Sequence, residues 1–226
     1  MSDITLVLAT GNNGKIREFK ELFSGFDINI KNLNDFGPIP SVTEDGETFE
    51  ENAYIKASFT SKVLGLPAIA DDSGLVVPAL NGVPGVYSAR YAGENATDEE
   101  NIKKLLNEME GISDRKAYFE TSLSIAVPRG YALTYEGRVD GEITRKPAGE
   151  NGFGYDPLFY YPPFGKTFAQ LTQEEKNSVS HRGNAMKELQ GEFDKVLIWL
   201  GNRLSEEPYA PGRCDNPAGS DKIVSK

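Results

Sequence analysis

The sequence has 226 residues and a formal net charge of −10, and both values limit the kind of protein it can be. The length suffices for one large domain, or for two lobes that share a sheet, with a full hydrophobic core. An acidic chain is poorly suited to broad nucleic-acid binding, because that binding depends on cationic contacts with phosphates. It does not exclude a nucleotide substrate, because a few lysines and a divalent cation can still form a positive pocket.

The sequence contains no signal for membrane insertion or secretion. A run of about 18 apolar residues, as a membrane helix requires, is absent. The first residues, MSDITLVLATGNN, lack the basic region and the long apolar region of a signal peptide. Cys214 is the single cysteine, so it can form no internal disulfide. We therefore expect a cytoplasmic protein with no membrane partner.

The first unit is predicted to be a strand, a turn and a helix. Residues 4–9 form an apolar run without alternation, as buried parallel strands do. The turn TGNNGK follows, and apolar residues then recur at helical spacing. The N–H groups at a helix start can bind an anion, and Lys15 would add charge beside them. The spacing fits neither a Walker A loop nor a dinucleotide fingerprint, so an ordinary turn with a solvated lysine is the alternative.

A short strand over 27–31 and an acidic loop containing Glu44 come next. Thr48 and Glu51 then form a capping box, which predicts a helix that runs to about residue 64. Lys56 lies on this helix. Lys56 and Glu44 are either site residues or ordinary solvated charges.

Two adjacent carboxylates, Asp71 and Asp72, follow the apolar run Ala-Ile-Ala. We expect them at the end of a buried strand, with Ser73 and Gly74 turning the chain. Acids in such a place are costly unless positive charge meets them, and ligands of α/β sheets bind outside strand ends. A divalent cation with a phosphate substrate would fit. The alternative is a turn in which one aspartate accepts backbone N–H bonds.

The middle of the chain predicts a helix and a hairpin. A second capping box at Thr97 opens a helix that closes near Gly111. Residues 117–127 alternate as a strand, and 131–143 return after a Pro-Arg-Gly turn, so an antiparallel hairpin is expected. With the first buried strand, this predicts an α/β fold with a mixed sheet.

The last third contains two unusual stretches. In GFGYDPLF, residues 152–159, glycines would allow close backbone approach and aromatic residues could stack on a ring, or the stretch is a tight turn with core aromatics. A short helical turn over 171–176 is expected to be joined by 177–179 to a long helix capped by Ser180. His181, the only histidine, lies in the first turn of that helix, as a ligand-facing donor or as a neutral exposed side chain.

The final segment differs in composition from the rest of the chain. Residues 205–226 are rich in proline, glycine and charge and poor in apolar residues. They predict a mobile tail after a single domain over residues 1–204.

Five motifs, in this order, resemble those of one enzyme family: TGNNGK, TFEENAYIKA, ADDSGL, FGYDPLF and EEKNSVSHRG. Over about residues 4–203 the chain is similar to the inosine triphosphate pyrophosphatases, also called XTP/dITP or non-standard purine NTP pyrophosphatases, especially the bacterial branch. The resemblance implies a long mixed β-sheet flanked by helices, two lobes around a central cleft, and a homodimer.

The resemblance also implies roles for individual residues. Asp72 matches the general base and metal ligand, Asp71 its acidic neighbour, and Glu44 a second Mg²⁺-binding acid. Lys15 and Lys56 would stabilise the phosphates during catalysis. The implied substrate-binding residues are Thr10, Gly11, Asn12, Asn13, Gly14, Lys15, Lys56, Ser73, Phe153, Gly154, Tyr155, Asp156, Lys176, His181 and Arg182.

The implied reaction is Mg²⁺-dependent hydrolysis of ITP, dITP or XTP to the monophosphate and pyrophosphate, which cleanses the nucleotide pool. Direct attack by water is favoured, because no Ser/His or Cys/His nucleophile is evident. Two alternatives remain at this point. One is a septum-inhibitor-like pyrophosphatase that acts on pyrimidine or modified nucleotides. The other is a nucleotide-binding module in which the acids are only structural.

Overall fold

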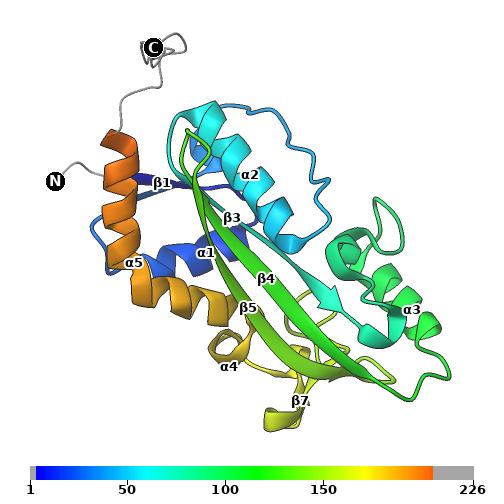
Figure 1. Ribbon diagram of the computed structural model, residues 1–226. Coiled ribbons are helices and arrows are strands. Elements are labelled where there is room, and N and C mark those ends of the chain that lie inside the picture. Colours follow the sequence, from blue (N-terminus) through cyan, green and yellow to red (C-terminus); the bar gives the residue numbers. More distant parts are fainter. Residues whose placement is uncertain (1–3, 206–226) are drawn as a thin grey trace, which may run out of the picture.

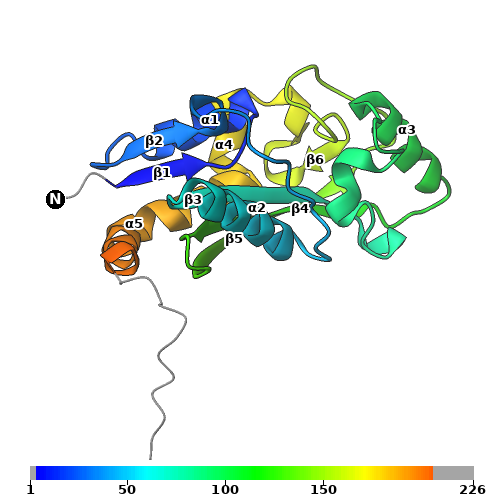
Figure 2. The same ribbon diagram turned by 90° about the horizontal axis from the view of Figure 1, so that it is seen from above.

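The computed structural model describes residues 4–205, and these form one mixed β-sheet with helices on both faces (Figures 1 and 2). Seven strands lie in the order β2-β1-β3-β4-β5-β6-β7. Their bounds are β1 (Thr5–Leu8), β2 (Asn29–Asn32), β3 (Ala68–Val76), β4 (Lys116–Ala126), β5 (Ala132–Ile143), β6 (Phe159–Tyr161) and β7 (Lys166–Thr167). β1 pairs in parallel with β2 and β3, and the remaining pairs are antiparallel. The expected α/β fold is confirmed.

The helices are α1 (Asn13–Leu22), α2 (Phe49–Leu64), α3 (Asp98–Glu108), α4 (Gln173–Val179) and α5 (His181–Ser205). α2 packs with Ala57 against Ala70 and Ala126. α1 and α5 pack with Ile69 and Ile125, whose side chains alternate to the opposite face of the same strands.

Two buried clusters share the long central strands. Near one end, Ile69 of β3 and Leu123 of β4 join the side chains of α1 and α5. Near the other end, Leu75 of β3 and Phe119 of β4 join those of α3 and β6. β3 and β4 therefore contribute to both clusters, and the middle of β3 lies between them.

The capping boxes at Thr48 and Thr97 and the hairpin are confirmed. The predicted turn at Ser73 and Gly74 is wrong, because β3 continues through both residues, which pair with Thr121 and Glu120 of β4. Gly74 serves a close approach instead: a Cβ there would lie 2.5 Å from the carbonyl oxygen of Gly85.

The last helices also begin and end differently from the prediction. The predicted linker 177–179 is helical, because α4 is opened by a capping box at Thr172 and extends to Val179. Ser180 caps α5 as expected, since its Oγ accepts the N–H of Gly183. α5 ends at Ser205, and the predicted tail beyond it lies outside the described residues. No helix in the range 4–205 is long and apolar enough to cross a membrane.

Candidate active site

The two adjacent acids of β3 lie on opposite faces of the sheet. β1 makes its last pair with Ile69, so Asp71 and Asp72 extend beyond the end of β1 in the middle of the molecule. Because side chains alternate along a strand, Asp71 shares the face of α1 and α5, and Asp72 shares the face of α2. Each acid therefore meets a different set of cations.

Asp71 is the centre of a buried ion-pair cluster. It is 3% exposed, and its Oδ2 lies 2.8 Å from Lys15 Nζ and 3.1 Å from Arg182 Nη2. Burial alone would raise the pKa of Asp71, but Lys15 and Arg182 outweigh burial and lower it well below the usual range. Asp71 is therefore a charged anchor that ties α1 and α5 to the sheet.

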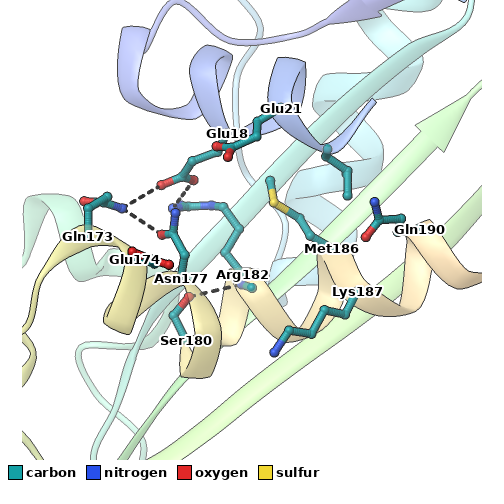
Figure 3. A pocket seen from close by; sticks show the side chains of 12 residues that line it. Glu18, Glu21, Gln173, Glu174, Asn177, Ser180, Arg182, Met186, Lys187 and Gln190 are labelled. Carbon is teal, nitrogen blue, oxygen red and sulfur yellow. Dashed lines mark hydrogen bonds and ion pairs between the residues drawn. The ribbon is translucent and has the colours of Figure 1, made fainter. Parts of the chain in front are cut away.

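Arg182 is almost fully engaged by acids. It donates to Asp71 through Nε and Nη2, to Glu18 of α1 through Nη1 at 3.3 Å, and weakly to Ser73 Oγ at 3.4 Å. Burial disfavours its charge, yet Asp71 and Glu18 keep its pKa above the ordinary value. Figure 3 shows the Arg182 side chain next to Glu18. Both line a cavity between α1, α4 and α5, whose volume is about 530 Å³.

The turn before α1 is closed by its own side chains. Asn12 Oδ1 accepts the N–H groups of Gly14 at 2.8 Å and Lys15 at 3.2 Å, and Thr10 Oγ1 accepts the N–H of Asn12. Those two N–H groups are thus already paired by the N-cap. Lys15, beside them, supplies the positive charge at this end of the site.

Asp72 and Glu44 converge on Lys56. Nζ of Lys56 lies 3.0 Å from Asp72 Oδ1 and 2.7 Å from Glu44 Oε2. Burial disfavours the charge of Lys56, but the two acids more than offset it and raise its pKa. For Asp72, burial raises the pKa, and the attraction to Lys56 does not fully compensate. The loop acid and the helix lysine that sequence patterns left ambiguous thus belong to one cluster.

A second cavity, of about 410 Å³, joins the two sets of charges. Its polar lining comes from four separate segments: the first turn with Thr10, Gly11 and Lys15, the 39–44 loop with Glu44, α2 with Lys56, and β3 with Asp71. Lysines and carboxylates thus meet in one polar cavity, which is a suitable place for a polyphosphate with a cation.

Two of the three predicted metal ligands, Asp72 and Glu44, are placed so that they could bind Mg²⁺. Among residues 4–205, no group of three or more His, Cys, Asp or Glu side chains is placed to hold a metal ion. Mg²⁺ is usually bound by one or two carboxylates together with substrate phosphates, so a pair suffices. Asp72 and Glu44 qualify, because their oxygens already converge on one cation, the Lys56 ammonium. Asp71 Oδ2 is occupied by Lys15 and Arg182.

A third cavity, of about 140 Å³, is aromatic and lies beside the acids. Ser73 and Gly74 line it directly after Asp72, and the 153–156 loop, Phe119, Lys176 and His181 complete most of its wall. Lys176 forms a buried ion pair with Asp156 and lies 4.7 Å from the centre of the Phe153 ring. Phe153 is 58% exposed, so much of its ring is accessible to a flat ligand.

His181 is buried, contrary to the exposed alternative. Its ring stacks on Phe119 at 5.0 Å, and its Nδ1 has no hydrogen-bond partner among residues 4–205. Burial, with Arg182 and Lys176 nearby, holds the pKa of His181 well below its ordinary value of 6.5. A neutral imidazole therefore faces this region of the molecule.

The structure thus brings most of the predicted residues together around the polar and the aromatic cavity, whereas Arg182 lines the separate cavity between α1, α4 and α5. Asn13 belongs to the first turn, and its side chain is outside the described part of the chain. Sequence reasoning missed Glu18, Ser88 and Asp98. Glu18 lies three residues after Lys15 on α1, a spacing that could have indicated a shared face. For Asp98, the sequence indicated only an acid in the first turn of a helix.

Comparison with known proteins supports a common origin. The model of the Ham1 family matches residues 6–192. The dITP/XTP pyrophosphatase of Desulfotalea psychrophila is 58% identical over 91% of this chain and 92% of its own length, and that of Syntrophobacter fumaroxidans is 58% identical over 94% and 91%. The Ham1 protein structure from Coxiella burnetii has a TM-score of 0.82 at 44% identity, covering 85% of this chain and 99% of its own. The chain belongs to the Ham1 family.

Proposed function

We propose that this protein hydrolyses deaminated purine nucleoside triphosphates, namely ITP, dITP and XTP, to the monophosphate and pyrophosphate, and so cleanses the nucleotide pool. Two relatives that are 58% identical over most of the chain are dITP/XTP pyrophosphatases, which supports this activity. The observation that carries the proposal is the path of β3. It places Asp72 on the acid–lysine cluster and, one and two residues later, Ser73 and Gly74 on the aromatic cavity.

The substrate spans both cavities in this proposal. The triphosphate occupies the polar cavity near Lys15 and Lys56, whose charges offset those of the phosphates. The purine lies against the exposed Phe153 ring in the aromatic cavity. The α-phosphate then lies near the middle of β3, next to Asp72.

Asp72 acts as the general base. Its carboxylate takes a proton from the water that attacks phosphorus, and Lys56 beside it stabilises the charge that develops on the phosphate oxygens. Glu44 and Asp72 would hold Mg²⁺, which when bound neutralises phosphate oxygens and orients the water. Lys15 stabilises the leaving pyrophosphate from the side of Asp71.

Base selectivity follows from which donors remain free. The N–H groups of Phe153 and Gly154 are paired with Asp156 and Asp98, so they do not read the base. Lys176 and His181 line the cavity and can donate to a 6-oxo group. Each buried donor that faces the 6-amino group of adenine instead costs about 1–3 kcal/mol. Two mismatches give a preference of roughly 10²–10⁴ over ATP.

We also propose a cytoplasmic homodimer. The family resemblance supports the assembly, and the presence of a single cysteine supports the location. Light scattering on the purified protein measures the assembly directly, and a mass of one subunit would contradict it.

A panel of triphosphates with product analysis tests the activity. We expect ITP, dITP and XTP to be hydrolysed well ahead of GTP, with GTP at or above ATP, and with pyrophosphate as the initial product. Nucleoside diphosphate and orthophosphate as first products would refute the position of bond cleavage. Turnover of pyrimidine nucleotides alone would support the septum-inhibitor-like alternative. No turnover with any nucleotide at saturating Mg²⁺ would leave only a binding module.

A further inference from the structure

The loop that presents Phe153 depends on its backbone for its shape. Gly152 and Gly154 flank Phe153, and both adopt positive φ, +80° and +59°. Such angles favour glycine because other residues are strained there. Phe153 is 58% exposed and meets the Lys176 ammonium on its ring, so apolar packing does little to fix the ring. The attachments of the loop backbone therefore contribute to where the ring lies.

Two long-range hydrogen bonds attach this loop to the segment before and within α3. Asp98, the first residue of α3, accepts the N–H of Gly154 through Oδ2 at 2.6 Å. The hydroxyl of Tyr155 donates to the carbonyl oxygen of Ser88 at 2.9 Å. The N–H of Phe153 donates to Asp156 Oδ2 within the loop, and that carboxylate is held in turn by its ion pair with Lys176 of α4. Asp98 is thus the one acid of α3 that binds this loop in the described part of the chain.

The segment that holds the loop is itself fixed to β3. Ser88 Oγ accepts the N–H of Leu75 at 2.9 Å, and the missing side chain of Gly74 lets the segment approach the strand. Asp72 lies two residues before Gly74 on the same strand. A short series of contacts therefore runs from the acid–lysine cluster along β3 and through Ser88 to the Phe153 loop. The bond from Gly154 to Asp98 attaches the loop to the same segment at a second point.

The position of Asp98 on α3 does not by itself explain this bond. Helix N-termini favour acids, but Thr97 already caps α3 with Glu100, and Glu99 adds another acid to the first turn. Asp98 is the only residue of this turn that lines the aromatic cavity. Its carboxylate points toward the loop and accepts the N–H of Gly154.

We infer that Asp98 is a positioning residue for nucleobase binding: by holding the Gly154 N–H, it sets the 152–156 loop so that the Phe153 ring lies where the purine stacks. This inference rests on the proposed function for the identity of the ligand. It predicts that loss of the Asp98 carboxylate weakens substrate binding while the acid–lysine cluster, and therefore the chemical step, remains intact.

The test compares three variants. Asp98→Ala removes the acceptor, and Asp98→Asn keeps an acceptor oxygen in a side chain of the same shape. Glu99→Ala removes a neighbouring helix acid that makes no hydrogen bond to the loop within the described residues. For Asp98→Ala, the KM for ITP should rise roughly threefold to tenfold, the loss expected for one exposed charged hydrogen bond, with kcat changed less than about twofold. Asp98→Asn should restore most of the loss, and Glu99→Ala should match the wild type.

Hydrogen–deuterium exchange of the peptide covering 150–158 in the free protein gives a readout without substrate. Exchange should be faster in Asp98→Ala and unchanged in Glu99→Ala. Equal exchange and equal KM in Asp98→Ala and the wild type would overturn the inference, as would equal effects of Glu99→Ala. Faster exchange with an unchanged KM would refute the role in base binding. Failure of the wild type to release pyrophosphate would refute the proposed function, whereas exchange would still decide whether Asp98 holds the loop.

Discussion

Replacing Asp71 by Asn should lower the free energy of unfolding, whereas the same change at Asp72 should not. Asp71 is 3% exposed and binds two cations, Lys15 at 2.8 Å and Arg182 at 3.1 Å. Asn has a similar shape but no charge, so it leaves Arg182, which is 6% exposed, with Glu18 as its remaining acid in the cluster. The α1–α5 face of β3 therefore loses its central anion.

The size of this effect follows from the geometry. Removing one partner of a buried ion pair costs about 3–5 kcal/mol. The lower end applies here, because the Lys15 side chain is 22% exposed and can reach water, and Arg182 keeps Glu18. We therefore expect a loss of about 3 kcal/mol in the free energy of unfolding, or about 6–12 °C in Tm for a domain of this size.

Urea unfolding at pH 7 measures the difference. Trp199 is the only tryptophan and packs partly buried against the α1–α5 cluster, so its fluorescence reports on this part of the core. Asp72→Asn is the matched control, since it removes an adjacent carboxylate on the other face of the strand. A loss below about 1 kcal/mol for Asp71→Asn, or an equal loss for both variants, would show that the cluster does not anchor the fold.

Four further predictions follow from the same structure. Asp72→Asn should lower kcat by about 10²-fold or more, because the carboxylate acts in the transition state, and near-normal turnover would mean that the acid is only structural. The Tm of this variant should be unchanged or higher, because loss of the charge relieves repulsion with Glu44. Chelation of Mg²⁺ should abolish pyrophosphate release, and Glu44→Gln, but not the control Asp45→Asn, should raise the Mg²⁺ concentration for half-maximal rate; equal responses would remove Glu44 from the metal site. Gly137→Ala should cost about 1–3 kcal/mol, because its Cβ would overlap the carbonyl oxygen of His181 and displace α5, and a neutral outcome in urea unfolding would contradict that packing. Because only the unfolded chain protonates His181 just below pH 6.5, the free energy of unfolding should fall as the pH drops below about 6.5, by up to about 1.4 kcal/mol per pH unit. His181→Gln should flatten this dependence of stability on pH, and an unchanged slope would contradict a buried neutral imidazole.

The sequence by itself determined the local elements and the identity of the charged residues. Capping boxes at Thr48 and Thr97 begin helices through bonds between residues three apart, so no tertiary contact was needed to predict them. The hairpin of β4 and β5 follows from alternation and one turn. The motif resemblance pointed to the residues that the fold gathers around the middle of β3.

Only the tertiary structure decided how those residues are arranged. β3 runs through Ser73 and Gly74 because β4 offers a partner for every residue of that stretch, and Gly74 leaves room for the Ser88 segment rather than turning the chain. That continuity puts Asp71 and Asp72 on opposite faces, which separates an anchoring acid from an acid beside Lys56. The bond from Gly154 to Asp98 joins residues far apart in sequence, and helix periodicity and turn chemistry carry no information about such pairs.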